Sequence, residues 1–282
     1  MRVVHSFVST NCDDRLLFVH LSYFVLSCIY AKESGFEIAV HCDNRAKEIL
    51  EIAPYDEIIT DLEGLLPPAN SHIYAWGKFE AMKKEPLGTI HIDGDVFLKS
   101  KGLQDVLEFA DYDCIVQNIE HLGTYSNGGN VSQLIWLINS SIFNSCEYPY
   151  WAKRDCDSMY NCGVVGFNNQ ELKDEYFATY NAMVKEYNNT RLNVDNTTPD
   201  IIIEQQFLKN LVEYKGYKTK FVLPYCDCFD SLCEEANHAH YQHVIGHAKE
   251  PNLDKTLLII KKHNAEIYDK LMEFKKQMYD NN

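Results

Sequence analysis

The sequence has few basic residues for its length. It holds 26 Lys and Arg against 41 Asp and Glu among 282 residues, so its formal net charge at pH 7 is −15. A nucleic-acid-binding protein needs a cationic face that displaces counterions from phosphates, and this charge balance disfavours that class. We therefore expect no nucleic-acid partner. Any phosphate ligand has to be held against a repulsive background.

The sequence also lacks an uninterrupted apolar run as long as a membrane span. Its longest apolar stretch, 16–30, contains His20, Ser22 and Ser27 and is shorter than the roughly 20 residues that cross a bilayer. We expect a buried helix there. The first residues show no basic segment followed by a long apolar one, and no small-residue cleavage site. We therefore expect a cytoplasmic protein whose ten cysteines stay reduced.

Repeats, low-complexity tracts and an interior linker are absent as well. With 46% hydrophobic and 24% charged residues, the composition excludes a disordered, collagen-like or coiled-coil chain. A chain of this length buries enough surface to fold without disulfides or a structural metal. The sequence therefore predicts one α/β domain with an elaborated C-terminal half.

Alternating strand and helix patterns predict a parallel sheet covered by helices. The strands are expected at 3–8, 36–41, 57–60, 88–92, 96–98, 113–116, 163–167 and 221–224. The helices are expected at 15–34, 45–52, 74–84, 103–109, 171–187, 200–212 and 253–278, the last of them amphipathic with a lysine-rich side. Segment 117–130 is polar and contains glycine, which is typical of a loop on the substrate side. The predicted fold is a mostly parallel mixed central sheet flanked by helices.

Two acidic residues, Asp93 and Asp95, flank Gly94 directly after a buried strand. Side chains at positions i and i+2 of an extended backbone point the same way, so the two carboxylates repel unless a cation lies between them. Mg²⁺ and Mn²⁺ take such oxygen ligands. The pair also lies at the carboxyl edge of the sheet, where open α/β proteins bind ligands. Gly94 leaves the turn free of a side chain, so that a ligand can approach the backbone. A solvated acidic turn is the alternative.

A second motif near the C-terminus supplies a matching imidazole. It reads His243-Val244-Ile245-Gly246-His247-Ala248-Lys249. An imidazole is a good third ligand for Mn²⁺. The Gly246 amide can donate to a phosphate oxygen, and Lys249 offers a point charge for it. The alternative for His243 is a histidine satisfied within a strand.

These two motifs, in this order, resemble those of nucleotide-sugar glycosyltransferases with the GT-A fold, most closely the family 8 type that includes galactosyltransferases and glycogenin. In that family the second motif usually ends Lys-Pro-Trp, whereas here it continues as Lys249-Glu250-Pro251-Asn252. The resemblance covers roughly residues 1–251. It implies a single GT-A-like, Rossmann-like domain over 1–282, made of a nucleotide-binding half (1–116), an acceptor and donor-sugar half (117–252) and a C-terminal amphipathic helix (253–282).

The resemblance also implies roles for residues between and before the two motifs. Asn161 and Gly163 match the strand beside the donor sugar, and Glu204 and Gln205 match a helical Asp-Gln pair. The positions implied to contact the donor are Thr10, Asp43, Trp76, Lys78, Gly163, Gln205, Gly246 and Lys249. The implied catalytic candidates are Glu204, Asp157 and Asn161, and the implied metal ligands are Asp93, Asp95 and His243. Each candidate also has a structural alternative as a cap, a turn or an exposed helix residue.

The resemblance implies a Mn²⁺- or Mg²⁺-dependent enzyme that moves a sugar from a UDP-linked donor to a glycan or lipid-linked acceptor. The family 8 likeness favours retention of configuration. Negative charge grows on the leaving phosphate, so stabilising that charge is the largest catalytic requirement. A bound cation reverses the sign of the local field in an acidic protein.

Four other interpretations stay open. A nucleotidyltransferase shares the sheet and carboxylates, but it needs a glycine-rich loop after the first strand, where this chain has Ser9-Thr10-Asn11-Cys12. A nucleotide-sugar-binding protein without turnover has the same motifs. Cys226, Cys228 and Cys233 suggest a zinc site, although structural zinc ligands usually follow a C-x₂₋₄-C spacing. The lysine-rich C-terminal helix suggests peripheral contact with the inner face of a membrane.

Overall fold

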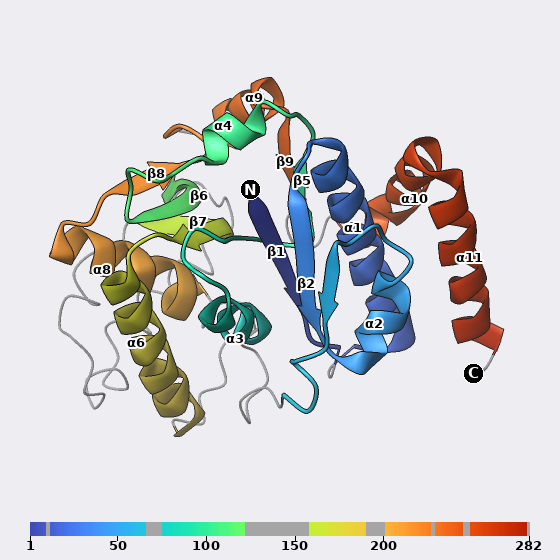
Figure 1. The fold of residues 1–282 in the computed structure, drawn as a ribbon, viewed down its shortest axis with the longest axis horizontal. Coiled ribbons are helices and arrows are strands. Elements are labelled where there is room, and N and C mark those ends of the chain that lie inside the picture. The colour runs from blue at the N-terminus through green and yellow to red at the C-terminus, as the bar shows by residue number, and fades with distance from the viewer. Residues whose placement is uncertain are drawn as a thin grey trace. The chain divides into compact units, whose positions relative to one another are not determined.

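The structure is a computed structural model that describes residues 1–9, 12–65, 75–121, 158–189, 201–226, 229–244 and 249–280. The chain folds into two compact units, each built from helices and strands (Figure 1). The first unit comprises Met1–Leu65, Thr89–Glu108 and Ala236–Asn282, and the second comprises Leu66–Gly88 and Phe109–Glu235.

The first unit contributes four parallel strands to the seven-stranded sheet, in the order β3-β2-β1-β4. They are β1 (Arg2–Phe7), β2 (Glu37–Cys42), β3 (Glu57–Ile59) and β4 (Ile90–Ile92). The central strands are buried on both faces, as the continuous apolar runs in their sequences predict. The expected parallel strands are confirmed within two residues at each end.

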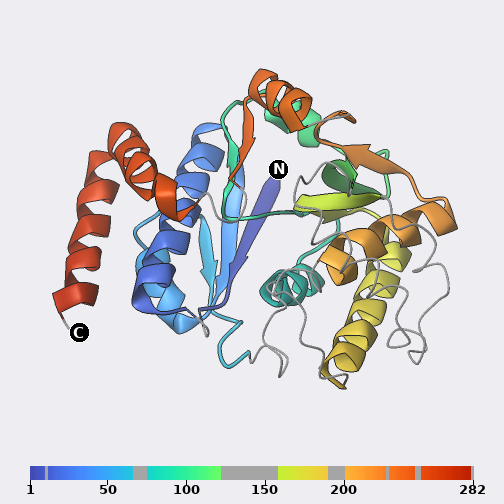
Figure 2. The same ribbon diagram turned by 180° about the vertical axis from the view of Figure 1, so that it is seen from behind.

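Helix α1 (Asp14–Glu33) forms the core of the first unit. Its N-terminus is capped by the Asp13 carboxylate, which accepts a hydrogen bond of 2.7 Å from the Leu16 amide. Among the described residues, α1 alone is long and apolar enough to cross a membrane, but 72% of its most apolar window is buried inside the protein. It contacts β2, β5 (Val96–Leu98) and α2 (Asn44–Leu50). Helix α10 (Leu253–His263) also contacts it, on the side away from the strands (Figure 2). The prediction of a buried helix is confirmed.

A two-stranded antiparallel ribbon completes the first unit. It pairs β5 (Val96–Leu98) with β9 (Tyr241–His243). The sequence did not predict β9, nor the helix α9 (Phe229–His238) before it. Helix α4 (Leu103–Leu107) follows β5.

The prediction of one C-terminal helix over 253–278 is wrong. After the short η5 (Glu250–Asn252), the chain forms two helices, α10 (Leu253–His263) and α11 (Ala265–Asp280). Asn264 between them has an extended backbone (φ −152°, ψ 101°), and its side-chain oxygen accepts a hydrogen bond of 3.0 Å from the Ile267 amide. An asparagine in this position offers the backbone a cap in place of continued helix, which ends one helix and starts the next.

Within the described residues, the second unit combines three strands with four helical segments, the first part of α9 and a shared aromatic core. Strand β6 (Cys114–His121) pairs antiparallel with β7 (Ser158–Phe167) and parallel with β8 (Thr219–Phe221). The helical segments are α3 (Trp76–Lys84), α6 (Gln170–Asn189), the π-helix η3 (Ile201–Gln206) and α8 (Phe207–Lys215). Phe79 stacks on Tyr180 with ring centroids 3.3 Å apart, and Tyr176 stacks on Phe207.

Two predictions for the second unit are corrected. Residues 117–121 belong to strand β6 and not to a substrate-side loop. The helix predicted over 200–212 begins as a π-helix and becomes α-helical only at Phe207. Pairing with the long, fully buried β7 carries β6 beyond the end that local polarity predicts, because ladder hydrogen bonds outweigh weak strand propensity. The fold class is nevertheless as expected, a mixed α/β protein with mostly parallel strand pairing and flanking helices.

Candidate functional site

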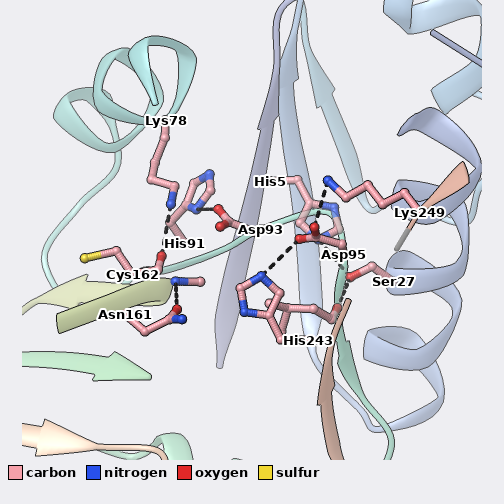
Figure 3. Close-up of polar contacts among 12 residues, drawn as sticks. His5, Ser27, Lys78, His91, Asp93, Asp95, Asn161, Cys162, His243 and Lys249 are labelled. Atoms are coloured by element: carbon pink, nitrogen blue, oxygen red, sulfur yellow. Dashed lines mark hydrogen bonds and ion pairs between the residues drawn. The ribbon is translucent and has the colours of Figure 1, made fainter. Parts of the chain in front are cut away.

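Asp93, Asp95 and His243 converge in the first unit (Figure 3). One ligand atom from each residue lies within 4.8 Å of the other two. Among the described residues, these three form the one group of His, Cys, Asp and Glu with a metal-binding arrangement. The close approach of the three predicted metal ligands is therefore confirmed.

Two backbone features bring these residues together. A turn after β4 is closed by the Val96 amide, which donates to the Asp93 carbonyl at 2.9 Å, and this turn presents both carboxylates. In the β5–β9 ribbon, Val96 lies opposite His243. The Val244 amide donates to the Asp95 carbonyl at 2.9 Å. The register of the ribbon thus fixes His243 beside Asp95.

The Asp95 carboxylate is buried, and its two oxygens face different partners. Its Oδ1 lies 3.4 Å from His243 Nε2, and its Oδ2 lies 2.7 Å from Lys249 Nζ. Burial by itself raises the pKa of a carboxyl group, but Lys249 and His243 outweigh that effect and hold the pKa of Asp95 below its ordinary value. Asp95 is therefore a charged carboxylate in a dry setting, which is costly without a nearby cation.

The Asp93 side chain is about one-third exposed and faces a histidine from the preceding strand. Its Oδ1 lies 3.8 Å from Nδ1 of His91, and Nε2 of that ring is 2.9 Å from the Ser6 hydroxyl. Ser6 and His91 come from the neighbouring strands β1 and β4. Neither residue was predicted from the sequence, although both lie near the ends of strands, where polar side chains signal a site at the edge of a sheet.

The expectation for Gly94 is wrong. A Cβ at this position would lie 2.1 Å from Cε2 of Phe24, so the space beside the glycine is filled by a buried ring from α1 and not open to a ligand. Glycine is required here because the helix packs directly on the turn. Ser27, one helical turn further along α1, donates from its hydroxyl to the Val96 carbonyl at 2.5 Å.

The donor set suits a hard divalent cation. The two carboxylates match the oxygen preference of Mn²⁺ and Mg²⁺, and the imidazole favours Mn²⁺ of the two. The burial of Asp95 would strengthen its attraction to a cation. Lys249 approaches the same carboxylate, so its ammonium is the charge with which a metal would compete.

In the second unit, two predicted site residues pair with each other. Lys78 Nζ lies 2.7 Å from Oε1 of Glu204, and it also donates to the Cys162 carbonyl at 2.9 Å. Both side chains are more than nine-tenths buried. The Tyr176 hydroxyl donates to the Glu204 carbonyl at 2.9 Å, which ties the π-helix to α6. Glu204 is thus not an exposed helix carboxylate.

Asn161 and Gly163 are joined within β7. The Asn161 side-chain oxygen accepts from the Gly163 amide at 2.9 Å, and its amide nitrogen donates to Oε1 of Glu120 at 2.7 Å. Asn161 and Glu120 are both buried. Glu120 was not predicted from the sequence, because residues 117–121 have the polarity of a loop.

The structure also describes three further residues that were predicted to contact the donor, Asp43, Trp76 and Gln205. Asp43 caps α2 by accepting from the Ala46 amide at 2.9 Å, and its other oxygen accepts from the Ser9 amide. Trp76 begins α3 and stacks on Tyr180 with ring centroids 5.9 Å apart. Gln205 is half-buried on η3.

Some predictions fall outside the described residues. They concern Thr10, Asp157, Gly246 and Cys228, together with 122–130 of the polar segment. Neither Cys226 nor Cys233 belongs to a metal-ligand group among the described residues.

Comparison with solved structures finds distant glycosyltransferases. An active-site mutant of LgtC is 9% identical with a TM-score of 0.46, covering 93% of this chain and 96% of that chain. The glycosyltransferase GlyE of Streptococcus pneumoniae TIGR4 is 10% identical with a TM-score of 0.42, covering 88% of this chain. Mouse xyloside xylosyltransferase 1 is 11% identical with a TM-score of 0.40, covering 88% of this chain and 95% of that chain. This chain spans 56% of the length of GlyE.

Comparison with curated proteins found no significant match. A family model does match, over residues 1–274, and its description is "Family of unknown function (DUF6734)". The chain therefore belongs to the DUF6734 family.

Proposed function

We propose that this protein is a divalent-cation-dependent glycosyltransferase. It transfers a sugar from a nucleoside diphosphate donor, UDP-linked in our proposal, to a glycan or lipid-linked acceptor with retention of configuration. The observation that carries the proposal is the approach of Asp93, Asp95 and His243 to within 4.8 Å. The motifs that contain them also resemble those of family 8 transferases in kind and order.

In this proposal Asp93, Asp95 and His243 hold Mn²⁺ or Mg²⁺. When bound, the cation acts as a Lewis acid that stabilises charge on the leaving diphosphate. Lys249 and the Gly246 amide bind a phosphate oxygen. The protein thereby binds an anionic donor despite a net charge of −15, because the charge that matters is local.

The proposed roles in the second unit are orientation of the donor sugar and of the acceptor. Asn161 and Gly163 lie on the same buried strand, and Glu204 carries a carboxylate on a π-helix, a conformation that is frequent at functional sites. Asp157 is a further catalytic candidate by sequence. Trp76, Lys78, Gln205, Thr10 and Asp43 remain proposed donor contacts.

Release of free nucleoside diphosphate tests the proposal. The purified protein is incubated with a panel of UDP-sugars and Mn²⁺, and UDP is measured with and without EDTA. We expect UDP release from at least one donor, and its loss with EDTA. Glycan and lipid-linked acceptors are supplied in parallel reactions. If UDP and Mn²⁺ raise the melting temperature but no donor releases UDP with either acceptor, the protein is a nucleotide-sugar-binding protein without turnover.

We also propose a cytoplasmic location, with the acceptor site at the inner face of a membrane. The lysines of α10 and α11 are the proposed membrane contact. Co-sedimentation with anionic liposomes, with Lys261, Lys262 and Lys276 replaced by Gln, tests that contact.

A further inference from the structure

Lys249 holds the position of a counter-ion at the proposed cation site. Its Nζ lies 2.7 Å from Oδ2 of Asp95, whereas Oδ1 of Asp93 lies 3.8 Å from Nδ1 of His91. Asp95 is 6% exposed, so water cannot neutralise its charge effectively. Lys249 therefore supplies the positive charge that this buried carboxylate requires.

A divalent cation would serve the same carboxylate. An ammonium and a metal ion bound at one buried carboxylate repel each other strongly, since the local dielectric constant is low. The two cations are thus alternatives at Asp95. His243, which faces the other oxygen at 3.4 Å, is an uncharged ligand in its neutral form and does not compete.

The surroundings of Lys249 allow its side chain to change partner without moving the backbone. Its carbonyl accepts hydrogen bonds from the Tyr23 hydroxyl at 2.7 Å and from the Asn252 amide at 3.2 Å. Its side chain is 20% exposed and has a flexible four-carbon stem. Figure 3 shows Lys249 reaching Asp95 from one side and His243 reaching it from another.

We propose that Lys249 is a resident counter-ion of Asp95 that a divalent cation displaces, so that metal binding and release of the Lys249 ammonium are one coupled step. This inference rests on the proposed function for the identity of the cation. It predicts weak metal binding by the free protein, because each metal ion must break an existing ion pair. The displaced ammonium is then free to bind an anionic ligand of the metal, which couples metal affinity to that ligand.

Mn²⁺ binding to the whole protein without nucleotide tests the exchange, with isothermal titration calorimetry as the readout. In this proposal Lys249 pairs with Asp95 in most molecules, and only the remaining fraction is free to bind Mn²⁺. The apparent Kd of wild type for Mn²⁺ is therefore higher than the intrinsic Kd by the inverse of that fraction, about tenfold or more. We therefore expect Lys249→Met to bind Mn²⁺ at least about tenfold more tightly than wild type. Lys249→Arg, which keeps the charge, should bind Mn²⁺ weakly. Lys101→Met, at an exposed lysine of the first unit, is the matched control and should match wild type.

Thermal melts provide a second measurement that does not depend on turnover. Metal-free Lys249→Met should melt below wild type, and saturating Mn²⁺ should raise its melting temperature more than that of wild type. The double variant Asp95→Asn/Lys249→Met has neither charge and should fold without responding to Mn²⁺. If Lys249→Met does not fold, a Lys249→Gln variant replaces it in both measurements.

The two hypotheses fail in different ways. If wild type binds Mn²⁺ and Asp95→Asn does not, but Lys249→Met has an unchanged or weaker Mn²⁺ affinity, the exchange is overturned and the metal site stands. If neither wild type nor Lys249→Met binds Mn²⁺ or Mg²⁺, both the exchange and the metal-dependent function are overturned.

Discussion

In the first unit, the carboxylate of Asp95 is shared between an imidazole and an ammonium, and the Asp93 carboxylate beside it is about one-third exposed. In the second unit, Lys78 and Glu204 pair directly, and both side chains are more than nine-tenths buried. The first cluster concentrates two negative charges close together, whereas the second is balanced by its own members. An arrangement with excess negative charge attracts a cation, whereas the members of a balanced buried pair satisfy each other's charge.

The largest expected effect comes from unbalancing the second cluster. Lys78→Met should leave the buried Glu204 carboxylate without its cation and lower the free energy of unfolding by about 3–5 kcal/mol, measured by urea denaturation. The double variant Lys78→Met/Glu204→Met should recover most of this loss. Lys83→Met on the same helix removes a more exposed ion pair with Glu80 and should cost only about 0–1 kcal/mol. Equal losses for Lys78→Met and Lys83→Met would contradict the structural role of the buried pair.

The next effect concerns turnover in the first unit. Asp95→Ala should lower the rate of metal-dependent UDP release by about 10²–10³-fold, the usual cost of losing one stabiliser of developing negative charge. The measurement is UDP release at the wild-type metal and donor concentrations. A variant that releases UDP at the wild-type rate would refute the metal role of Asp95.

Crowding the turn between the two carboxylates should reduce stability moderately. Gly94→Ala puts a methyl group 2.1 Å from the Phe24 ring, which we expect to cost about 1–3 kcal/mol in unfolding free energy. Gly102→Ala is the control, because the nearest atom to its added methyl is the Ser100 hydroxyl at 3.5 Å. Adding Phe24→Leu to Gly94→Ala should recover part of the loss. If Gly94→Ala and Gly102→Ala melt alike, the ring does not restrict the turn.

Low pH should reduce the stability of the first unit because the unit contains a buried histidine, His5, near Asp95. Burial lowers the pKa of His5 to about 3, although Asp95 partly opposes the shift. The unfolded chain therefore binds a proton below about pH 6.5 that the folded chain does not, and stability falls as pH falls. His5→Gln should remove up to about 1.4 kcal/mol per pH unit from that slope between pH 6.5 and 4. The measurement is unfolding free energy against pH, and an unchanged slope would contradict the assignment.

The smallest effect comes from two serines that hydrogen-bond the same strand, Ser27 in α1 and Ser34 at the C-cap of that helix. Ser27 donates to the Val96 carbonyl and Ser34 donates to the Leu98 carbonyl. Replacing either by Ala should cost about 0.5–1.5 kcal/mol in stability. Only Ser27→Ala should also weaken Mn²⁺ binding, because Val96 adjoins Asp95. Equal Mn²⁺ affinity in the two variants would show that α1 supports the strand without positioning the carboxylate.

Local patterns predicted a large part of this protein. Helix α1 and strands β1 to β4 follow from apolar runs, the Asp13 cap and Gly35, which takes φ 85° after the helix. The carboxylate pair was identifiable because i and i+2 spacing after a strand is visible in the sequence. By contrast, the end of β6 and the start of β7 depend on each other, and the π-helical turn before α8 left no recognisable pattern.

The sequence alone determined which chemical groups are present and in what order, because strand and helix periods and short motifs are local properties of the chain. Only the tertiary structure decided their partners. The β5–β9 register sets His243 beside Asp95, and the fold pairs Lys249 with Asp95 and Lys78 with Glu204. Such pairings depend on packing between segments far apart in sequence, and no local pattern encodes them.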